Sequence, residues 1–302
     1  MVRLNRCDGE QRDDDANRGN RMLHGGPPYG PIRANIARYS GFAVCYTEHA
    51  IVSRFRFYGQ LNDFLPWQWR HGRFAHALRG PASVKDVIES LGVPHPEVDV
   101  IVVNGQAVDF TYRVKDGDDV AVYPAFHRVD ISGLHRVGSD PPQPVRFVLD
   151  IHLRKLAALL RLAGFDALLR TDDAEVAQVS AVDRRVALTR DIGLLKRSVI
   201  QYGYWVRHTD PELQFIEVLQ RFDLAERMDP FVRCMECNTL LMPVDVDTVA
   251  ERLPPGTRQC FSQFHRCPGC DRVYWQGSHY ERLVRLLEDA RRQVRPKPDR
   301  TQ

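Results

Sequence analysis

The chain has 302 residues, a net charge of +3, 43% hydrophobic residues and 27% charged residues. This balance is typical of a globular protein with a sizeable core, and the length predicts about two domains. No stretch approaches the roughly 18 consecutive apolar residues of a membrane span, and the polar first 20 residues lack the apolar core of an export signal. These features exclude a membrane-spanning protein, and we expect a cytoplasmic one.

Residues 1–50 are rich in Arg, Asp, Asn, Gly and Pro and show no sustained hydrophobic period. Such a composition does not bury enough apolar surface to offset the entropy of ordering the chain. We therefore expect this segment to be disordered, or to be a non-native extension with true translation starting near Val52.

Residues 51–127 read as a small α+β domain. VSRFRFYG alternates apolar and polar residues, as a half-buried strand does, and SVKDVIESLGVP predicts a helix capped by Ser83 and ended by Gly92. VDVIVVNGQAV predicts a hairpin that turns at Asn104 and Gly105, and VKDGDDVAVYPAF predicts a turn followed by a last strand.

This order of elements, with its final DGDDVAVYP, resembles the β-grasp sulfur-carrier proteins of thiamin and molybdopterin synthesis. Those carriers end in a free Gly-Gly, whereas here YPAFHRV continues into the chain, so we do not expect carrier chemistry. The resemblance implies a ubiquitin-like domain that docks a protein partner or contacts RNA. Residues 128–144 follow as a linker, which three prolines are expected to stiffen: Pro141, Pro142 and Pro144.

Residues 145–230 alternate between short apolar runs and amphipathic stretches. The predicted strands are VRFVL, FDALLRT, VALTR and YWVRHT, and a helix follows each of them. Gly203 is expected to end the third helix, IGLLKRSVIQYG, and Pro211 to lie in the first turn of the fourth. Short connections between strands and helices predict right-handed βαβ units and therefore a parallel sheet.

Acidic residues follow every one of these predicted strands. They are Asp150, Asp172, Asp173, Asp191 and Asp210. Because the carboxyl ends of parallel strands share one edge, we expect these side chains to converge there. Gathered carboxylates repel one another unless a cation offsets their charge, and hard oxygen ligands suit Mg²⁺ or Mn²⁺, for which Asp150 and Asp191 are the best candidates. The alternative is that each aspartate simply caps the helix that follows it.

Four of the seven cysteines form two C-x-x-C pairs, Cys234 with Cys237 and Cys267 with Cys270. In a chain without an export signal, paired cysteines favour zinc over disulfides. Two such pairs complete a tetrahedral site, and a closed four-cysteine site is structural and not catalytic. We therefore expect a zinc ribbon and a final helix over residues 231–290, with 29 residues between the pairs.

Basic and aromatic residues around this ribbon are candidates for binding RNA, because aromatic rings stack on bases and cations hold phosphates. Ser278 is expected to cap the last helix, and 291–302 is expected to form a basic tail. The candidates are Arg154, Lys155, Tyr274, Trp275, His279 and Arg282. The alternative is an aromatic pair in the core followed by a solvated tail.

Five motifs of residues 145–288 together resemble the Mut-seven C-terminal ribonuclease-like family. They are FVLDIHLRKLAALLRLAGFD, TDDAEV, ALTRD, RCMECN and CPGCDRVYWQGSH. That family is similar to PIN nucleases with an appended zinc ribbon, and it often follows a ubiquitin-like domain. The resemblance implies a metal-dependent RNA hydrolase. Its motif acids fall on Asp150, Asp172, Asp173 and Asp191, and its zinc ligands on the four paired cysteines.

The sequence thus predicts a PIN-like parallel sheet flanked by helices, with an N-terminal β-grasp domain and a C-terminal zinc ribbon. The expected segments are 1–50, 51–127, 128–144, 145–230, 231–290 and 291–302. The predicted function is a ribonuclease with structural zinc and catalytic Mg²⁺ or Mn²⁺ that acts on RNA. Two alternatives are a non-catalytic RNA-binding module and a scaffold in sulfur transfer or tRNA modification, recruited through the β-grasp domain.

Overall fold

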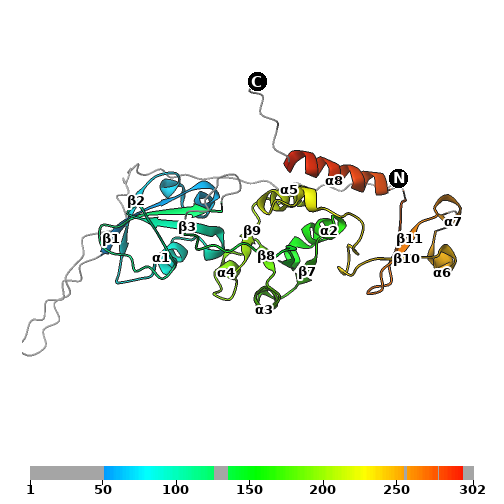
Figure 1. Cartoon of the computed structure of the whole chain (residues 1–302), viewed down its shortest axis with the longest axis horizontal. Coiled ribbons are helices and arrows are strands. Elements are labelled where there is room, and N and C mark those ends of the chain that lie inside the picture. The colour runs from blue at the N-terminus through cyan, green and yellow to red at the C-terminus, as the bar shows by residue number, and fades with distance from the viewer. Residues whose placement is uncertain (1–50, 126–134, 255–256, 278, 295–302) are drawn as a thin grey trace, which may run out of the picture. The chain divides into compact units, whose positions relative to one another are not determined.

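The computed structural model describes residues 51–125, 135–254, 257–277 and 279–294 (Figure 1). Three predictions fall outside these described residues: the disordered or non-native segment 1–50, the capping role of Ser278, and the part of the basic tail beyond residue 294. Within the described ranges, no helix is long and apolar enough to cross a membrane.

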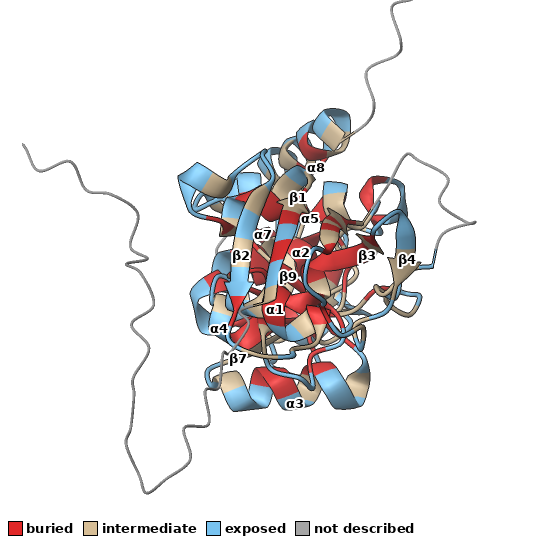
Figure 2. Cartoon of the chain, turned by 90° about the vertical axis from the view of Figure 1, so that its left-hand side faces the viewer, coloured by how far each residue is buried: buried red, intermediate tan, exposed pale blue. Residues whose placement is uncertain are grey.

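Residues 51–124 form a β-grasp domain, a five-stranded sheet with the strand order β2-β1-β5-β3-β4. β1 and β5 are parallel, and the other neighbours are antiparallel. Figure 2 shows the buried residues in red along β3. The strands and the one α-helix are β1 (Ile51–Phe57), β2 (Phe74–Leu78), α1 (Val84–Ser90), β3 (Val98–Val103), β4 (Gln106–Val108) and β5 (Asp119–Pro124). The 3-10 helices are η1 (Gly59–Phe64), η2 (Trp67–Trp69) and η3 (His95–Glu97).

The structure confirms two features of this domain that the local sequence predicted, a helix cap and a hairpin turn. The Ser83 side chain accepts a hydrogen bond from the Asp86 backbone N–H, which confirms it as the cap of α1. Asn104 and Gly105 both adopt positive φ angles, 50° and 84°, as a two-residue hairpin turn between β3 and β4 requires. β2 was not predicted, because FAHAL carries little hydrophobic alternation until it pairs with β1.

The second domain contains a four-stranded parallel sheet with the order β7-β6-β8-β9. Along β6, Phe147 and Leu149 face one hydrophobic core, with α2, α5 and α8, and Val148 faces another, with α3 and α4. The predicted parallel sheet flanked by helices is therefore confirmed. The bounds are β6 (Phe147–Asp150), η4 (Ile151–Leu153), α2 (Arg154–Leu162), β7 (Ala167–Arg170), α3 (Asp173–Asp183), β8 (Val186–Thr189), α4 (Ile192–Leu195), β9 (Gly203–Trp205), α5 (Pro211–Arg221) and η5 (Ala225–Arg227).

The prediction for the third helix of this domain was wrong. α4 is a single turn, and Gly203 begins β9 and does not end a helix. A Cβ on Gly203 would lie 2.7 Å from a methyl group of Leu195, so glycine lets the strand approach α4 closely. The fourth strand is also shorter than predicted and ends at Trp205.

The C-terminal part forms a three-stranded antiparallel ribbon, β10-β11-β12, followed by one long helix. Leu287 and Ala290 of that helix are buried in the core of the parallel-sheet domain. The helix continues through Val294, so the first residues of the expected basic tail are helical. The elements are β10 (Met242–Val244), α6 (Val246–Val249), η6 (Ala250–Arg252), α7 (Thr257–Cys260), β11 (Phe264–Arg266), β12 (Val273–Trp275) and α8 (Tyr280–Val294).

The described part of the expected linker packs against the β-grasp domain. The Val137 backbone N–H donates to the carbonyl of Asp99 at 2.8 Å, and Arg136 forms an ion pair with the Asp99 carboxylate at 2.9 Å. Residues 136–138 are therefore attached to Asp99 of β3, and the linker role of 128–144 stays a prediction.

Gly164, which follows α2, yields a stability prediction. Its φ is +94°, and an added Cβ would collide with the carbonyl oxygen of Asp229. We expect Gly164→Ala to lower the free energy of unfolding by about 2 kcal/mol or more, measured by urea unfolding. Gly80→Ala is the matched control, because a Cβ there would meet nothing within 4 Å. Equal stability of the two variants would contradict the prediction.

Candidate functional site

The carboxyl edge of the parallel sheet carries a short chain of hydrogen bonds around Thr189. The buried Asp150 carboxylate accepts a hydrogen bond from the Thr189 hydroxyl through Oδ2 at 2.5 Å. The same hydroxyl oxygen accepts from the Asp191 backbone N–H at 2.9 Å. Because β6 and β8 are neighbours, this arrangement holds Asp150 and Asp191 on either side of one buried threonine.

Each of the four strand-end aspartates also caps the helix that follows it. Asp150 accepts from the His152 backbone N–H. Asp172 accepts from the backbone N–H groups of Ala174 and Glu175, Asp191 from that of Gly193, and Asp210 from those of Glu212 and Leu213. Asp173 is the first residue of α3. The capping role that the sequence left open is thus present at Asp150, Asp172, Asp191 and Asp210 but not at Asp173.

The aspartates are less tightly gathered than a metal cage of three or more carboxylates would require. Among the described residues, the one group of three or more ligand atoms within 4.8 Å of one another is made of cysteines. Asp210 lies five residues beyond the end of β9 and is exposed. The oxygen donors still suit Mg²⁺, which is commonly bound through one or two carboxylates plus waters and substrate phosphates.

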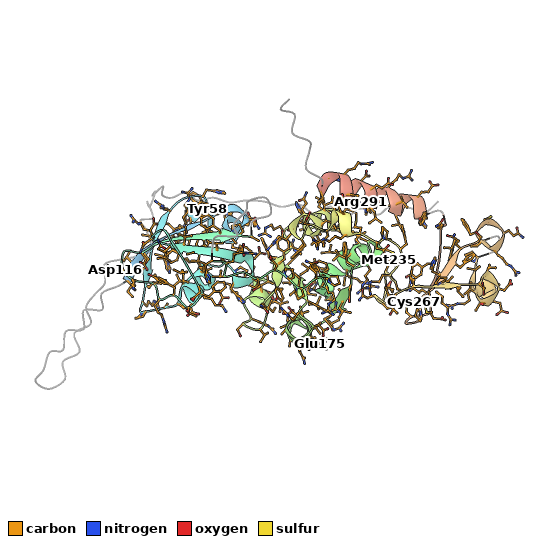
Figure 3. All side chains as sticks on the ribbon, viewed as in Figure 1. Tyr58, Asp116, Glu175, Met235, Cys267 and Arg291 are labelled. Carbon is orange, nitrogen blue, oxygen red and sulfur yellow. The ribbon has the colours of Figure 1, made fainter. Side chains whose placement is uncertain are left out.

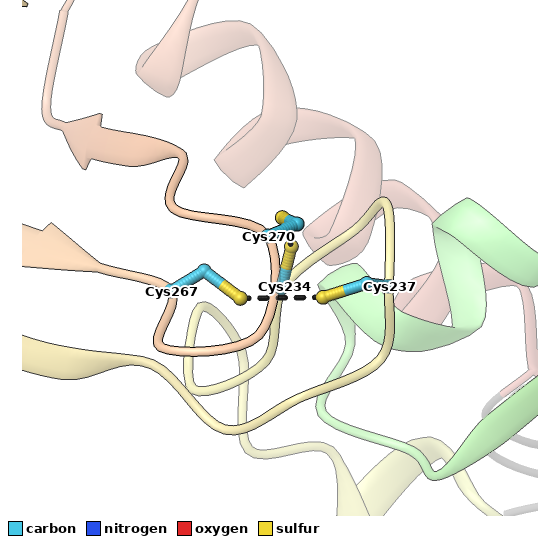
Figure 4. A group of neighbouring side chains, drawn as sticks. All are labelled: Cys234, Cys237, Cys267 and Cys270. Atoms are coloured by element: carbon cyan, nitrogen blue, oxygen red, sulfur yellow. Dashed lines mark hydrogen bonds between the residues drawn. The ribbon is translucent and has the colours of Figure 1, made fainter.

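The four paired cysteines come together from two loops and point toward one another (Figure 4). Their sulfur atoms all lie within 4.8 Å of one another, and Sγ of Cys237 lies 3.2 Å from Sγ of Cys267. In a tetrahedral zinc–thiolate site with bonds of about 2.3 Å, sulfurs are about 3.8 Å apart. Cys234, Cys237, Cys267 and Cys270 therefore fit a zinc ion with a small adjustment.

The two cysteine loops share one backbone hydrogen-bond pattern and one backbone conformation. Asn238 N–H donates to the carbonyl of Cys234 at 3.0 Å, and Asp271 N–H donates to that of Cys267 at 2.8 Å. Asn238 and Asp271 each stand four residues after the first cysteine of their pair, and both have positive φ angles, 72° and 64°. This repetition supports two zinc knuckles, each offering two thiolates to one ion.

The surroundings of the thiols set which of them carry protons. Burial would raise the pKa of Cys237, but hydrogen bonds from Thr239 and Cys267 bring it down to about 6. Burial and the hydrogen bonds shared with neighbouring sulfurs raise the pKa of Cys270 to about 12, and burial also raises the pKa of Cys267. Without a cation, Cys237 is therefore a thiolate at neutral pH, whereas Cys267 and Cys270 are thiols.

Zinc binding should consequently release protons. All four ligands must be thiolates in the complex, so Cys267 and Cys270 must lose theirs. We expect at least about two protons to be released per zinc near pH 7, and the affinity to fall at least about 100-fold for each unit of decreasing pH. The fall should steepen below about pH 6, where Cys237 also becomes protonated. Calorimetric titration in buffers of different ionisation enthalpy measures this number, and a value of zero would contradict the prediction.

Arg161 fastens the first knuckle to the parallel-sheet domain. Arg161 is a charged residue of the amphipathic helix α2, but its side chain is buried. It donates to the carbonyls of Ala167, Met235 and Glu236 at 2.7, 3.0 and 2.7 Å (Met235 is labelled in Figure 3). The helix therefore presents a buried cation to backbone oxygens of the knuckle, a role that needs partners more than 70 residues away in sequence.

The structure separates the predicted RNA-binding residues into three groups. Arg154 forms an ion pair with Glu236 at 2.6 Å, whereas Lys155 and Arg282 are exposed. The Tyr274 hydroxyl lies 3.1 Å from Sγ of Cys234, so this tyrosine supports the cysteine site. Tyr274, Trp275 and His279 all line a cavity of about 380 Å³. The cavity also has aromatic and basic lining residues that the sequence did not indicate: Phe231, Arg233, His265 and Tyr280.

Residues 145–287 match the family model of the Mut7-C RNAse domain, and residues 50–130 match that of the Mut7-C ubiquitin domain. The chain combines a Mut7-C ubiquitin domain with a Mut7-C RNAse domain. The Mut7-C RNAse match spans the parallel sheet, its aspartate edge and all four paired cysteines. The Mut7-C ubiquitin match spans the β-grasp sheet. No curated protein and no solved structure matches the chain.

Sequence reasoning missed the residues that join the Mut7-C ubiquitin domain to β9 of the Mut7-C RNAse domain. The buried Glu97 carboxylate accepts from the Trp205 backbone N–H at 2.7 Å and from Arg207 at 3.4 Å. Burial raises the pKa of Glu97, and the positive charge of Arg207 opposes that rise. Arg207 also forms an ion pair with Asp63 at 2.9 Å. These partners lie more than 100 residues apart, so no local pattern signals them.

Proposed function

We propose that this chain is a divalent-metal-dependent ribonuclease in which zinc has a structural role. The observation that carries the proposal is the hydrogen-bonded set of Asp150, Thr189 and Asp191 at the carboxyl edge of a Mut7-C RNAse domain. In open α/β sheets, ligands bind at this edge of the sheet. The proposed substrate is cytoplasmic RNA.

Asp150 and Asp191 are the proposed ligands of Mg²⁺ or Mn²⁺. A bound divalent ion would lower the pKa of a water and offset charge on the phosphodiester. Thr189 would keep the Asp150 carboxylate oriented, because its hydroxyl donates to that carboxylate. Asp172 and Asp173 follow the neighbouring strand and are proposed to complete the negative edge, and a catalytic role for Asp210 stays a prediction.

The ribbon and α8 are proposed to hold the RNA. Their cavity of about 380 Å³ combines aromatic rings with basic side chains, and none of the described residues that line it is acidic. Trp275 and His279 would contact a base there, and the exposed Lys155 and Arg282 would contact phosphates. Tyr274 would act indirectly, through its contact with Cys234.

A second candidate function is a non-catalytic RNA-binding module. It is favoured by the helix-capping bonds of all four strand-end aspartates and by the absence, among the described residues, of three carboxylates within metal-ligand distance of one another. On this alternative the acids stabilise helices and the zinc ribbon binds RNA. A scaffold role in sulfur transfer or tRNA modification would instead use the Mut7-C ubiquitin domain to dock a protein.

The deciding experiment is cleavage of end-labelled single-stranded RNA by the zinc-loaded full chain. We expect cleavage with Mn²⁺ or Mg²⁺ and none when both are withheld. RNA binding without cleavage at any Mn²⁺ concentration would favour the binding-module alternative. The same titration, followed by chemical shifts at the carboxyl edge of the sheet, tests whether Asp150 and Asp191 respond to the ion.

A further inference from the structure

Trp67 is the most exposed large hydrophobic residue among those that the structure describes. Its relative exposure is 81%, and it begins η2 in the Mut7-C ubiquitin domain. Two residues later, Trp69 stacks on Phe74 with ring centroids 4.7 Å apart and an interplanar angle of 7°. One tryptophan of the pair therefore packs and the other stands in solvent, although both belong to the same short helix.

The loop that displays Trp67 is held in place on both sides. The Asn62 side chain donates to the carbonyls of Phe57 and Gly59, and it accepts from the His71 backbone N–H at 2.7 Å. Arg70 Nε donates to the Leu65 carbonyl at 2.8 Å. These bonds fix the backbone before and after the tryptophan, so the loop itself loses little freedom when a partner binds.

This loop adjoins the carboxyl edge of the nuclease sheet. The Phe64 ring lies 5.1 Å from the Trp205 ring at the end of β9. In the sheet, Trp205 pairs with Thr189, whose hydroxyl bonds to Asp150. The segment that begins at Phe64 and includes Trp67 three residues later is therefore anchored at the end of β9.

The charge around Trp67 indicates the kind of partner. Between Asp63 and Asp86 the chain has no acidic residue. The basic residues in that interval are Arg70, His71, Arg73, His76, Arg79 and Lys85. Arg73 forms an ion pair with Asp119. An exposed ring in a segment that is basic and free of acids suits a stacked base with its phosphates, whereas a protein partner would call for an apolar interface core.

We propose that Trp67 is a stacking platform for an unpaired base of single-stranded RNA, with Arg70 and Arg79 near the RNA backbone. The proposal deepens the ribonuclease function proposed above and rests on it: the Mut7-C ubiquitin domain receives the RNA strand and presents it to the edge that carries Asp150. Recognition is through the base face and the phosphates, so it tolerates any sequence but requires unpaired nucleotides.

The test measures the affinity of the zinc-loaded full chain for a fluorescent 12-nucleotide oligouridine, without Mg²⁺ or Mn²⁺, so that binding is read without cleavage. We expect Trp67→Ala to weaken binding roughly 5- to 100-fold, as loss of one stacked base does. Trp67→Phe should recover part of that loss. Val182→Ala is the matched control, because Val182 is 73% exposed but lies on α3, and it should leave affinity unchanged.

The outcomes separate this inference from the ribonuclease proposal. One outcome is that the parent binds the RNA and Trp67→Ala binds it more weakly, but the parent does not cleave RNA with Mn²⁺ or Mg²⁺. In that case the platform stands and the nuclease proposal fails. Parent-like affinity of Trp67→Ala, with a native circular dichroism spectrum, would overturn the platform whatever the cleavage result. An equal loss of affinity for duplex RNA would also overturn it, because paired bases offer no free face to the ring.

Discussion

Asp150→Asn is expected to reduce RNA cleavage at least roughly 100-fold while changing the free energy of unfolding by less than about 1 kcal/mol. Asparagine can still accept the hydrogen bond from the His152 N–H and can still pair with the Thr189 hydroxyl. It brings no negative charge to a cation, however, so the proposed metal site loses affinity. If Asp150 only capped the helix, the substitution would leave both RNA cleavage and metal affinity unchanged.

Metal-dependent stability gives an independent measurement of the same prediction. An ion that binds only the folded chain raises the melting temperature. We expect Mn²⁺ to stabilise the parent and to stabilise Asp150→Asn and Asp191→Asn much less. Asp109→Asn is the control, because Asp109 accepts from the Thr111 backbone N–H in a comparable local bond but belongs to the Mut7-C ubiquitin domain. If both edge variants cut RNA as fast as the parent, the metal-site proposal is wrong.

Cys267→Ser is expected to remove zinc, which should otherwise amount to about one ion per chain, and to unfold the ribbon. Structural zinc contributes about 10–16 kcal/mol of apparent binding free energy at pH 7, far more than the ribbon's small sheet and few buried side chains supply. The parallel sheet should remain folded, because α8 contributes Leu287 and Ala290 directly to its core. Its stability should still fall by a few kcal/mol, because the buried Arg161 loses the Met235 and Glu236 carbonyls.

Zinc content measured by mass spectrometry and limited proteolysis between residues 240 and 264 test this prediction. Cys260→Ser is the matched control, since Cys260 is exposed and stands outside the group of four. The control should keep its zinc and its protease resistance. Stoichiometric zinc in a variant lacking both Cys234 and Cys267 would refute the four-cysteine site.

The features that were predictable from sequence rest on interactions within a few residues. Ser83 caps α1 through a bond to Asp86, three positions on, and Asn104 with Gly105 makes a turn of its own. The C-x-x-C spacing shapes each knuckle in the same local way, and strand–helix alternation with short loops allows few arrangements other than a parallel sheet. The capping role of each strand-end aspartate is local too, which is why the sequence could state it but could not choose between capping and metal binding.

The features that the sequence left undecided depend on partners far along the chain. Gly203 reads as a helix end, yet its pairing with Ala187 of β8 makes it the start of a strand. Arg161 reads as a surface cation, yet carbonyls more than 70 residues away bury it. Such contacts depend on how helices and strands pack, and a buried charge is tolerated only when that packing supplies its hydrogen bonds.

The six-residue motif PWQWRH has both kinds of feature: some that the sequence predicts and some that only tertiary contacts decide. Composition alone determines that it is aromatic, basic and free of acids, and Pro66 favours a turn. Trp69 packs because the pairing of β2 with β1 brings Phe74 beneath it, whereas the Trp67 side chain is 81% exposed. Sequence therefore determined the chemistry of this surface, and only the pairing of distant strands decided which ring is presented to solvent.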